Sequence, residues 1–270
     1  MQQDTFEIKR STSAIGAELH GFEPFAPSAA EVLKRLVGQH GVICIRDTPM
    51  SPEQEIRLAS QLGSIVPTPQ LRKIDGFPLI EEVRKTPVQA RGLGDVWHTD
   101  QSFRPRPPRY TVLFAKELPP VGGDTLFASM AAAYDALSEQ CKASLSTLQA
   151  LHVDCGPYGN AIHKDDPLTP QTRHAVHPVV ITLPGSERRS LYLSPDKTWR
   201  FDGWTNEESE GLLNFLLRFV QRPEFTVRYR WRPGTALVWD NYQTWHYAVN
   251  DYAGHTRVMH RMMVDGDPFA

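Results

Sequence analysis

The stretch from residue 92 to residue 103, GLGDVWHTDQSF, places a histidine and an aspartate one residue apart, directly after a tryptophan. In an extended chain, residues i and i+2 point to the same side, so the imidazole of His98 and the carboxylate of Asp100 can reach one metal ion without backbone strain. Two ordinary polar residues on a loop would show the same spacing. The pair therefore permits a metal site without requiring one.

A third candidate ligand lies far downstream, in the segment 235–264, TALVWDNYQTWHYAVNDYAGHTRVMHRMMV. Here His246 follows a strand-like run and a turn-like Asp-Asn pair. Arg257 and Arg261 come after it, and the planar guanidinium of arginine pairs with carboxylate or sulfonate groups in two-point fashion. Near a metal, these arginines would bind a cosubstrate and a substrate, both anionic. Alone, they would equally fit the solvent side of a strand.

The first hundred residues predict two short helices and a strand between them. Residues 28–40, SAAEVLKRLVGQH, have apolar residues at helical spacing after a serine and stop before a glycine, which indicates a helix. Residues 51–63 predict a second helix, because serine, proline and acidic residues occupy its start and glycine its end. The β-branched run 41–47, GVICIRD, indicates a buried strand.

From about residue 109 onward, the pattern changes to short β-branched or alternating segments, which predicts an antiparallel architecture rich in turns. The predicted strands are residues 109–118, 176–183, 190–194, 225–234, 235–241 and 257–264. Two predicted helices interrupt them, at residues 130–148 and 206–221. The polar, pattern-free segment 156–173 is a candidate active-site loop or lid.

The composition favours one globular domain over residues 1–270, since no repeat, low-complexity tract or linker divides the chain. The 29 basic and 31 acidic residues leave no basic surplus, which argues against nucleic acid and against a membrane as partners. Three isolated cysteines favour neither a disulfide framework nor a cysteine-rich zinc module. With no apolar leader and no long apolar run, the sequence predicts a cytoplasmic protein.

Five motifs taken together resemble a known enzyme family. WHTD, KELPPVGGDTLFASM, HPVV, WDNYQTWHYAVNDY and RVMHR are similar, in order and spacing, to the taurine dioxygenase and 2,4-dichlorophenoxyacetate dioxygenase family of iron(II)- and 2-oxoglutarate-dependent oxygenases. The resemblance extends from about residue 19 to the end of the chain. Each motif is modest by itself, but the ordered set is specific.

The resemblance implies a ligand set and a cosubstrate site. His98, Asp100 and His246 would form the two-histidine, one-carboxylate triad that leaves iron positions open for 2-oxoglutarate and O2. The far carboxylate of 2-oxoglutarate would meet Arg257 and Thr125, and the Gly-Gly pair before Asp-Thr would let the backbone turn so that this hydroxyl faces inward. No general base is implied, because the metal ligands are the only catalytic groups required.

The resemblance also implies the fold and the reaction. The fold would be mainly β with flanking helices, a distorted double-stranded β-helix, or jelly-roll. The reaction would couple the decarboxylation of 2-oxoglutarate to succinate and CO2 with hydroxylation of an unactivated C–H bond, while desaturation, cyclisation or cleavage after hydroxylation would use the same machinery. Relatives form dimers or tetramers, so a homo-oligomer is expected.

The substrate prediction is coarser. In the taurine enzymes the arginine that corresponds to Arg261 holds the sulfonate, and we predict Arg261 and Gln101 as substrate-binding residues. The partners of the taurine amine are replaced here by Thr68, Leu71 and Gly94. We therefore expect an anionic organic molecule with a bulkier body, namely a carboxylate, a sulfonate or a sulfate ester, rather than taurine.

Two positions carry residues that are unusual for the resemblance. Ser194 and Lys197 stand where relatives usually have asparagine and an aromatic residue. The lysine would either supply a second cation for a larger or doubly charged substrate or point to solvent, and we favour solvent. The remaining histidines, including His177 in HPVV, are predicted to be structural or exposed.

Two other functions stay open from the sequence. A zinc hydrolase could use the same three ligands to activate water, although it would have no use for a cosubstrate arginine and threonine. A non-catalytic metal- or ligand-binding protein would also keep the triad. Consumption of 2-oxoglutarate would argue against the zinc hydrolase. The absence of a charge-transfer absorption band after Fe(II) and 2-oxoglutarate are added would favour the non-catalytic binding protein.

Overall fold

The computed structural model describes residues 6–69, 71–155 and 172–266, and its largest element is a sheet of eight strands in the order β1-β2-β3-β14-β6-β16-β5-β4. Only β2 and β3 pair in parallel, and the other neighbours are antiparallel. The strands are β1 Glu7–Arg10, β2 Ala17–His20, β3 Val42–Ile45, β4 Lys73–Ile74, β5 Phe77–Lys85, β6 Tyr110–Glu117, β14 Ala236–Asp240 and β16 Arg257–Val264.

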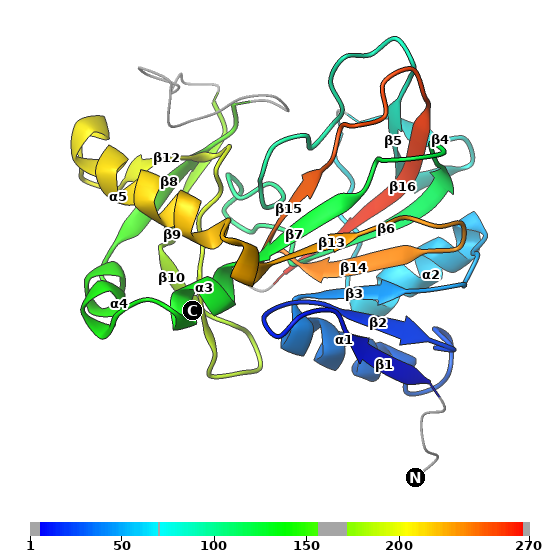
Figure 1. The fold of residues 1–270 in the computed structure, drawn as a ribbon, viewed down its shortest axis with the longest axis horizontal. Coiled ribbons are helices and arrows are strands. Elements are labelled where there is room, and N and C mark those ends of the chain that lie inside the picture. The colour runs from blue at the N-terminus through cyan, green and yellow to red at the C-terminus, as the bar shows by residue number, and fades with distance from the viewer. Residues whose placement is uncertain (1–5, 70, 156–171, 267–270) are drawn as a thin grey trace.

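A second, smaller sheet faces this one, in the order β13-β7-β15. Its strands are β13 Thr226–Tyr229, β7 Thr125–Ser129 and β15 Thr244–Ala248. In Figure 1 the three strands lie in front of the large sheet, with β13 crossing close to β14. A cluster of large side chains, among them Phe127, Tyr229, Trp239 and Met259, fills the space between the two sheets. Two facing antiparallel layers are the predicted jelly-roll arrangement.

Two helices cover the other face of the large sheet, α1 Ala29–His40 and α2 Pro52–Leu62. Their apolar stripes, including Leu33, Leu36 and Leu58, pack against Ile43 and Val238 of the sheet. Both helices were predicted from the sequence. The capping box expected at the start of α2 is present, because the Ser51 side chain accepts from the backbone N–H of Gln54.

The rest of the chain forms a layer beside the two sheets (Figure 1). It holds one sheet in the order β12-β8-β9, a hairpin of β10 and β11, and three helices that share a second core. The elements are α3 Met130–Asp135, α4 Glu139–Leu145, β8 Gln149–Val153, β9 His174–Pro178, β10 Val180–Thr182, β11 Arg189–Leu191, β12 Thr198–Phe201, α5 Asn206–Val220 and the 3-10 turn Pro223–Phe225.

Some predicted elements were wrong in their extent. The helix predicted over residues 130–148 is two helices, because Leu137 turns into the core and the Ser138 side chain caps a new helix at the N–H of Cys141. The strand predicted over residues 176–183 is interrupted after Pro178, which has no N–H to donate.

Strands β1, β2, β4, β5, β7, β8 and β12 were not predicted. β1 is exposed along its whole length, β5 has a mixed burial pattern, and β7 pairs with β15 far along the chain, so local sequence signals for these strands are weak. The candidate loop at 156–173 lies, apart from its last two residues, outside the described residues. Among the described residues, no helix has both the length and the apolar character needed to cross a membrane.

Candidate active site

His98 and His246 are joined through their backbones, although they are far apart in the chain. The N–H of His98 donates to the carbonyl of His246 at 3.1 Å, and the N–H of His246 donates back at 2.8 Å, an isolated antiparallel bridge beside β15. This bridge places the two imidazole rings 3.9 Å apart between centroids. The jelly-roll strand that carries His246 thus meets the loop that carries the His-x-Asp pair.

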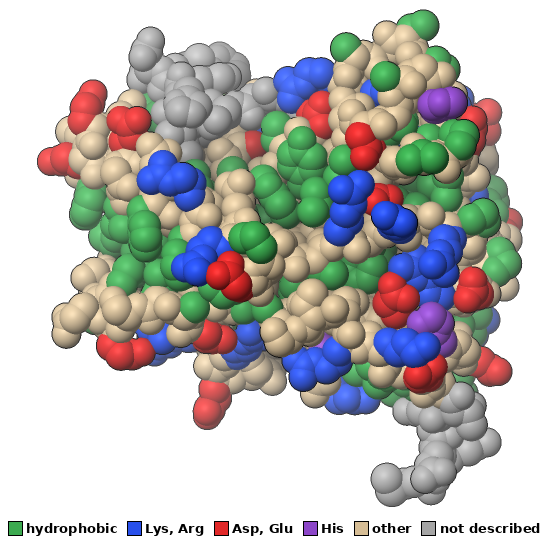
Figure 2. Space-filling view, viewed as in Figure 1, with side chains coloured by type: hydrophobic (Ala, Val, Ile, Leu, Met, Phe, Trp, Pro, Cys, Tyr) green, Lys and Arg blue, Asp and Glu red, His purple; other side chains and the backbone are tan. Residues whose placement is uncertain are grey.

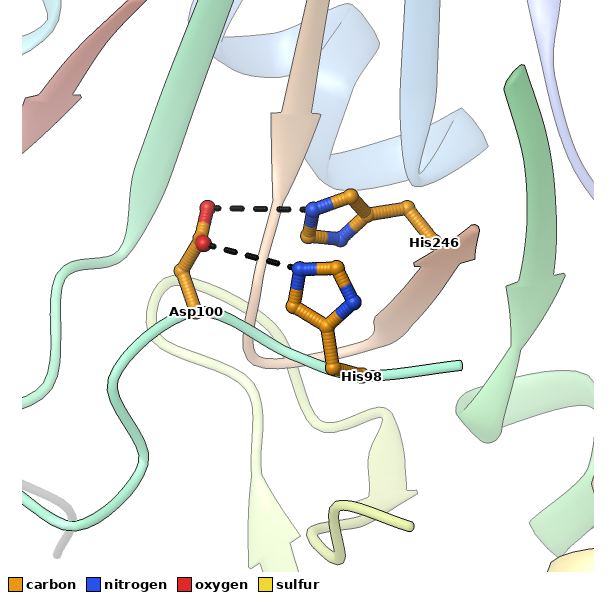
Figure 3. Close-up of side chains that lie close together, drawn as sticks. All are labelled: His98, Asp100 and His246. Carbon is orange, nitrogen blue, oxygen red and sulfur yellow. Dashed lines mark ion pairs between the residues drawn. The ribbon is translucent and has the colours of Figure 1, made fainter. Parts of the chain in front are cut away.

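Asp100 completes the cluster. Its Oδ1 lies 3.9 Å from Nε2 of His98, and its Oδ2 lies 4.0 Å from Nε2 of His246. In Figure 3 the carboxylate faces both imidazole rings, with His98 and Asp100 on one segment and His246 on a neighbouring strand. One ligand atom from each residue lies within 4.8 Å of the others, which is close enough for a single metal ion. The structure therefore brings the three predicted ligands together.

Hydrogen bonds hold two of the ligands in orientations that suit a metal. Nδ1 of His98 lies 2.8 Å from the carbonyl of Val96, which makes Nδ1 the protonated nitrogen and turns Nε2 toward the cluster. The Thr111 hydroxyl donates to Oδ2 of Asp100 at 2.7 Å. Burial lowers the pKa of His246 well below its usual value, so this imidazole is neutral, as a metal ligand must be.

Asp100 is ionised despite being only 4% exposed. Burial alone would raise its pKa, but the guanidinium of Arg261, 3.4 Å away, and the hydrogen bond from Thr111 outweigh that effect and lower the pKa to about 2. The site therefore presents a carboxylate and two imidazoles, the donor set of non-haem iron centres with open positions.

Asn241 is a supporting residue that the sequence analysis did not single out, although it lies in the quoted motif WDNYQTWHYAVNDY. Its side-chain oxygen accepts from Nε1 of Trp239 at 2.9 Å and from the N–H of Asp100 at 3.4 Å. Its amide nitrogen donates to the Thr111 hydroxyl at 2.9 Å, and the Thr99 hydroxyl donates to its carbonyl at 2.7 Å. The side-chain amide of Asn241 thus holds the backbone N–H of Asp100 and, through the Thr111 hydroxyl, its carboxylate.

A small chamber of about 40 Å³ lies next to the triad and is lined by His98, His246, Thr125 and Arg257. Arg257 is only 4% exposed, and its Nε donates to the carbonyl of Gly123 at 3.0 Å. Within the part of the chain that the structure describes, its buried Nη2 has no hydrogen-bond partner. An unpartnered buried guanidinium nitrogen is costly unless an acceptor joins it. A ligand carboxylate in this chamber would remove that cost.

The glycine pair before Thr125 forms the expected turn. Gly122 and Gly123 have φ angles of +83° and +70°, and a Cβ on Gly122 would meet the Asp251 carboxylate at 2.4 Å. That carboxylate accepts from the N–H of Gly123 at 2.7 Å. The Thr125 hydroxyl is buried, accepts from Nε1 of Trp231 at 3.0 Å and lines the small chamber, as predicted from the turn.

The small chamber adjoins a larger cavity of about 560 Å³, because both are lined by Val83, Leu93, Gly94, His98 and Arg261. The larger cavity has apolar walls from side chains such as Leu71 and Phe103, and Gln101 also lines it. Among the described residues, its charged lining is balanced, with four carboxylates and four cations: Glu82, Asp100, Asp154 and Asp196 against Arg84, Arg173, Lys197 and Arg261.

The two predicted substrate residues line this cavity but already have protein partners. The guanidinium of Arg261 pairs with the buried carboxylate of Glu81 at 2.8 Å, a contact that the sequence analysis missed. Gln101 has a φ of +44°, its amide nitrogen donates to the Thr68 hydroxyl at 2.8 Å, and its oxygen accepts from Arg104 at 3.1 Å. A positive φ in a residue other than glycine is typical of functional segments.

Lys197 does not point to solvent, and that prediction was wrong. Its side chain is 8% exposed, lines the larger cavity and pairs with Asp196 at 2.7 Å. Asp196 accepts in turn from the Ser194 hydroxyl at 2.7 Å. His177, by contrast, is structural as predicted, because its Nε2 donates to the carbonyls of Ser102 and Arg104, at 2.9 and 3.0 Å.

A sequence profile of the family described as "Taurine catabolism dioxygenase TauD, TfdA family" matches residues 7–263, nearly the whole chain. The chain belongs to this family. It is accordingly a dioxygenase of the 2-oxoglutarate-dependent, non-haem iron class, as the resemblance of its motifs predicted.

Curated members of the TauD/TfdA family are similar over most of their length. An alkylsulfatase from Acinetobacter baylyi is 31% identical over 97% of this chain and 85% of its own length. An alpha-ketoglutarate-dependent sulfate ester dioxygenase from Pseudomonas putida is 30% identical, over 94% and 87%. An alpha-ketoglutarate-dependent 2,4-dichlorophenoxyacetate dioxygenase from Cupriavidus pinatubonensis is 29% identical, over 81% and 82%.

Solved structures of TauD/TfdA-type proteins share the fold. A taurine dioxygenase from Burkholderia xenovorans superposes with a TM-score of 0.83, at 30% identity, over 97% of this chain and 90% of its own. AAD-2, solved in complex with Mn(II) and N-oxalylglycine, gives a TM-score of 0.83 at 26% identity, over 98% of this chain and the whole of AAD-2. The predicted jelly-roll is thereby confirmed.

Proposed function

We propose that this protein uses Fe(II) at His98, Asp100 and His246 and 2-oxoglutarate at Arg257 and Thr125 to oxidise a small organic anion with O2. The observation that carries the proposal is the combination, in one buried place, of three ligand atoms within 4.8 Å of one another and a buried arginine nitrogen that has no hydrogen-bond partner among the described residues. A zinc hydrolase or a passive metal-binding protein would need the first feature but not the second.

The residues of the site fit both a ferrous ion and 2-oxoglutarate. Two imidazoles and one carboxylate suit a ferrous ion and leave positions open for other ligands. Arg257 would hold the far carboxylate of 2-oxoglutarate, with the Thr125 hydroxyl beside it, since both line the small chamber next to the triad. When bound, the metal and the keto acid supply the oxidising chemistry, with succinate and CO2 as co-products.

The task of the protein's own residues is then to position the substrate and exclude water. Val83 and Leu93 line the boundary between the two chambers, and Leu71 and Phe103 extend the apolar wall of the larger one. A substrate body held there would present one C–H bond to the metal. Arg261 would contact its anionic group from the metal end of the cavity, and Gln101 would line the same end.

Charge balance supports an anionic substrate. The charges that line the large cavity cancel among the described residues, so a divalent metal, dianionic 2-oxoglutarate and the buried Arg257 leave one net positive charge. Low-dielectric sites are most stable when neutral, which favours a singly charged ligand. Relatives named for sulfate esters and for 2,4-dichlorophenoxyacetate act on such anions, so we propose a sulfate ester, sulfonate or carboxylate with a bulky body.

Gly94 supports the exclusion of taurine itself. Its φ is +79°, and a Cβ there would approach Cε1 of His98 to 3.0 Å. An asparagine at this position, as in the taurine enzymes that the sequence resembles, would be strained and crowded. The cavity therefore has no side chain here to bind an amine, and the space is left to a larger substrate.

We also propose a homo-oligomer in a reducing cytoplasm. The three cysteines, all among the described residues, form no disulfide with one another. Figure 2 shows acidic and basic side chains interspersed on one face. Light scattering coupled to gel filtration would test the assembly, and a purely monomeric species would contradict it.

The function is tested by succinate release. The purified protein is incubated with Fe(II), 2-oxoglutarate and O2 and with a panel of alkyl sulfates, alkanesulfonates and aryloxyacetates. We expect substrate-dependent succinate from the native chain and from the control His255→Ala, whose histidine is exposed and away from the triad, but none from His246→Ala. If the protein binds metal but consumes no 2-oxoglutarate, with or without a substrate, the result would contradict the proposal and favour hydrolysis.

A further inference from the structure

Glu81 is a fully buried carboxylate at the metal end of the larger cavity, with an exposed fraction of 0%. It lies on β5 directly opposite Arg261 of β16, in the antiparallel register of the large sheet. Its Oε2 accepts from Nε of Arg261 at 2.9 Å and lies 2.8 Å from Nη2 of the same guanidinium. Nothing in the sequence motifs points to this residue.

The other oxygen of Glu81 is also occupied. It accepts from the backbone N–H of Thr68 and lies 3.3 Å from Nζ of Lys73, whose side chain is 23% exposed. The carboxylate is thus held by one arginine, one lysine and one backbone N–H. Such a carboxylate does not move when a ligand enters, because moving away from its partners would leave a buried charge unpaired.

Arg261 is the cation that would meet the substrate, but its own charge is largely compensated. Beyond the two contacts to Glu81, its Nη1 lies 3.4 Å from Oδ1 of Asp100 and its Nη2 lies 3.4 Å from the Thr68 hydroxyl. The guanidinium therefore bridges a structural carboxylate and a metal ligand. An anion at this point meets a neutralised arginine, not an isolated positive charge.

We propose that Glu81 is a specificity-determining residue, which weakens the attraction of Arg261 for anions so that charge alone does not hold a ligand in the cavity. A small hydrophilic anion then gains too little from Arg261 to bind. A singly charged molecule with an apolar body gains the rest from the walls formed by Leu71, Val83 and Phe103. This inference rests on the proposed function, since it concerns the substrate of the same site.

The test measures ligand affinity without turnover. The protein is saturated with Mn(II) and N-oxalylglycine, the pair bound in solved AAD-2, and titrated by calorimetry with hexanesulfonate, methanesulfonate and the neutral hexanesulfonamide. Removing the negative charge next to Arg261 in Glu81→Gln should tighten hexanesulfonate binding roughly tenfold and make methanesulfonate binding measurable. The affinity for the sulfonamide should stay the same, because this molecule is neutral and its binding does not depend on the charge of residue 81.

Two further variants keep the test decisive. Glu18→Gln removes the same charge from another carboxylate that pairs with an arginine, Arg46, but lines neither chamber, so the sulfonate affinity should stay unchanged. Lys73→Met removes the lysine that shares Glu81, which leaves the carboxylate wholly to Arg261. Sulfonates should then bind about twofold more weakly, the opposite direction. This lysine is partly exposed, so the variant tests the idea even if Glu81→Gln unfolds.

Unchanged or weaker sulfonate binding in folded Glu81→Gln would overturn the inference, as would an equal gain for the sulfonamide. If Glu81→Gln does not fold, tighter or unchanged sulfonate binding in Lys73→Met would overturn it. The two proposals fail separately. A chain that does not bind N-oxalylglycine contradicts the proposed function, whereas a chain that binds it but shows no charge-specific effect of Glu81 contradicts only this inference.

Discussion

At the scale of single residues, Asp100 shows how the site is prepared before any metal arrives. Burial would keep this carboxyl protonated, but the Arg261 guanidinium and the hydrogen bond from Thr111 lower its pKa to about 2. The Thr111 hydroxyl and the N–H donated to Asn241 fix where the carboxylate points. The ligand is therefore charged and oriented in advance, which reduces the free energy that metal binding must spend on reorganisation.

The two arginines of β16 should affect different ligands. Arg257→Ala removes the guanidinium of the small chamber and should weaken 2-oxoglutarate binding roughly a hundredfold, as expected for losing a buried charge partner. Arg261→Ala should chiefly weaken binding of the substrate that is oxidised. Titration calorimetry with 2-oxoglutarate, and apparent KM values for both ligands, check this difference. Equal effects of the two variants on both ligands would contradict the assignment.

The second layer of the metal site can be tested without touching a ligand. Thr111→Val keeps the shape of the side chain but removes its hydrogen bonds to Asp100 and Asn241. Metal affinity should fall roughly tenfold or more, measured by competition with a chelating dye. Thr48→Val loses only a hydrogen bond from its hydroxyl to the Arg46 carbonyl, outside the site, and should leave the metal affinity unchanged.

At the scale of elements, the sheet β12-β8-β9 carries two buried histidines. Burial lowers the pKa of His152 well below its usual value and lowers that of His177 as well. His152 is fully buried, and neither ring nitrogen has a hydrogen-bond partner in residues 6–69, 71–155 and 172–266. Both rings pack against Tyr192, at centroid distances of 5.6 and 5.5 Å, so this layer requires neutral imidazoles.

This requirement predicts acid sensitivity. In the unfolded chain, histidine takes up a proton near pH 6.5, whereas the folded state keeps His152 neutral, so the free energy of unfolding should fall as the pH drops below that value. Each such histidine contributes about 1.4 kcal/mol per pH unit. Urea unfolding of the native chain and of His152→Gln, from about pH 7.5 to about pH 5.5, should show a shallower slope for the variant. Parallel curves would refute this.

The elements also show where sequence reasoning succeeded. Helices α1, α2 and α5 were predicted because capping residues and apolar periodicity are local signals. The helix over 130–148 was broken by a local core contact of Leu137, and β7 was missed because its identity as a strand depends on pairing with β13 and β15. Such pairing is decided by distant residues.

At the scale of the whole molecule, ligands that bind only the folded state should stabilise it. With metal and 2-oxoglutarate each at about a hundred times its dissociation constant, each adds about 2.7 kcal/mol to the free energy of unfolding. For a chain of this size, the melting temperature should rise by roughly 5 °C or more. Scanning calorimetry checks this, and His246→Ala should lose the metal-dependent part of the shift.

The same calorimetry tests the prediction of one domain over residues 1–270. Helix α3 contacts both β15 of the smaller facing sheet and α5 of the neighbouring layer. Because these contacts connect the sheets with that layer, unfolding should occur in a single transition. Two resolved transitions, of which only one shifts with metal, would show that the layers unfold separately.

The family could be recognised from the sequence, and the three candidate ligands and the arginine pair could be predicted, because ordered motifs preserve the type and spacing of chemical groups. The charge partners of those groups became visible only in the folded chain. The bridge between His98 and His246, the cross-strand pairing of Glu81 with Arg261 and the burial of Lys197 join residues that are distant in the chain. Electrostatic interactions depend on distance in space and on burial, and neither quantity can be read from positions along a chain.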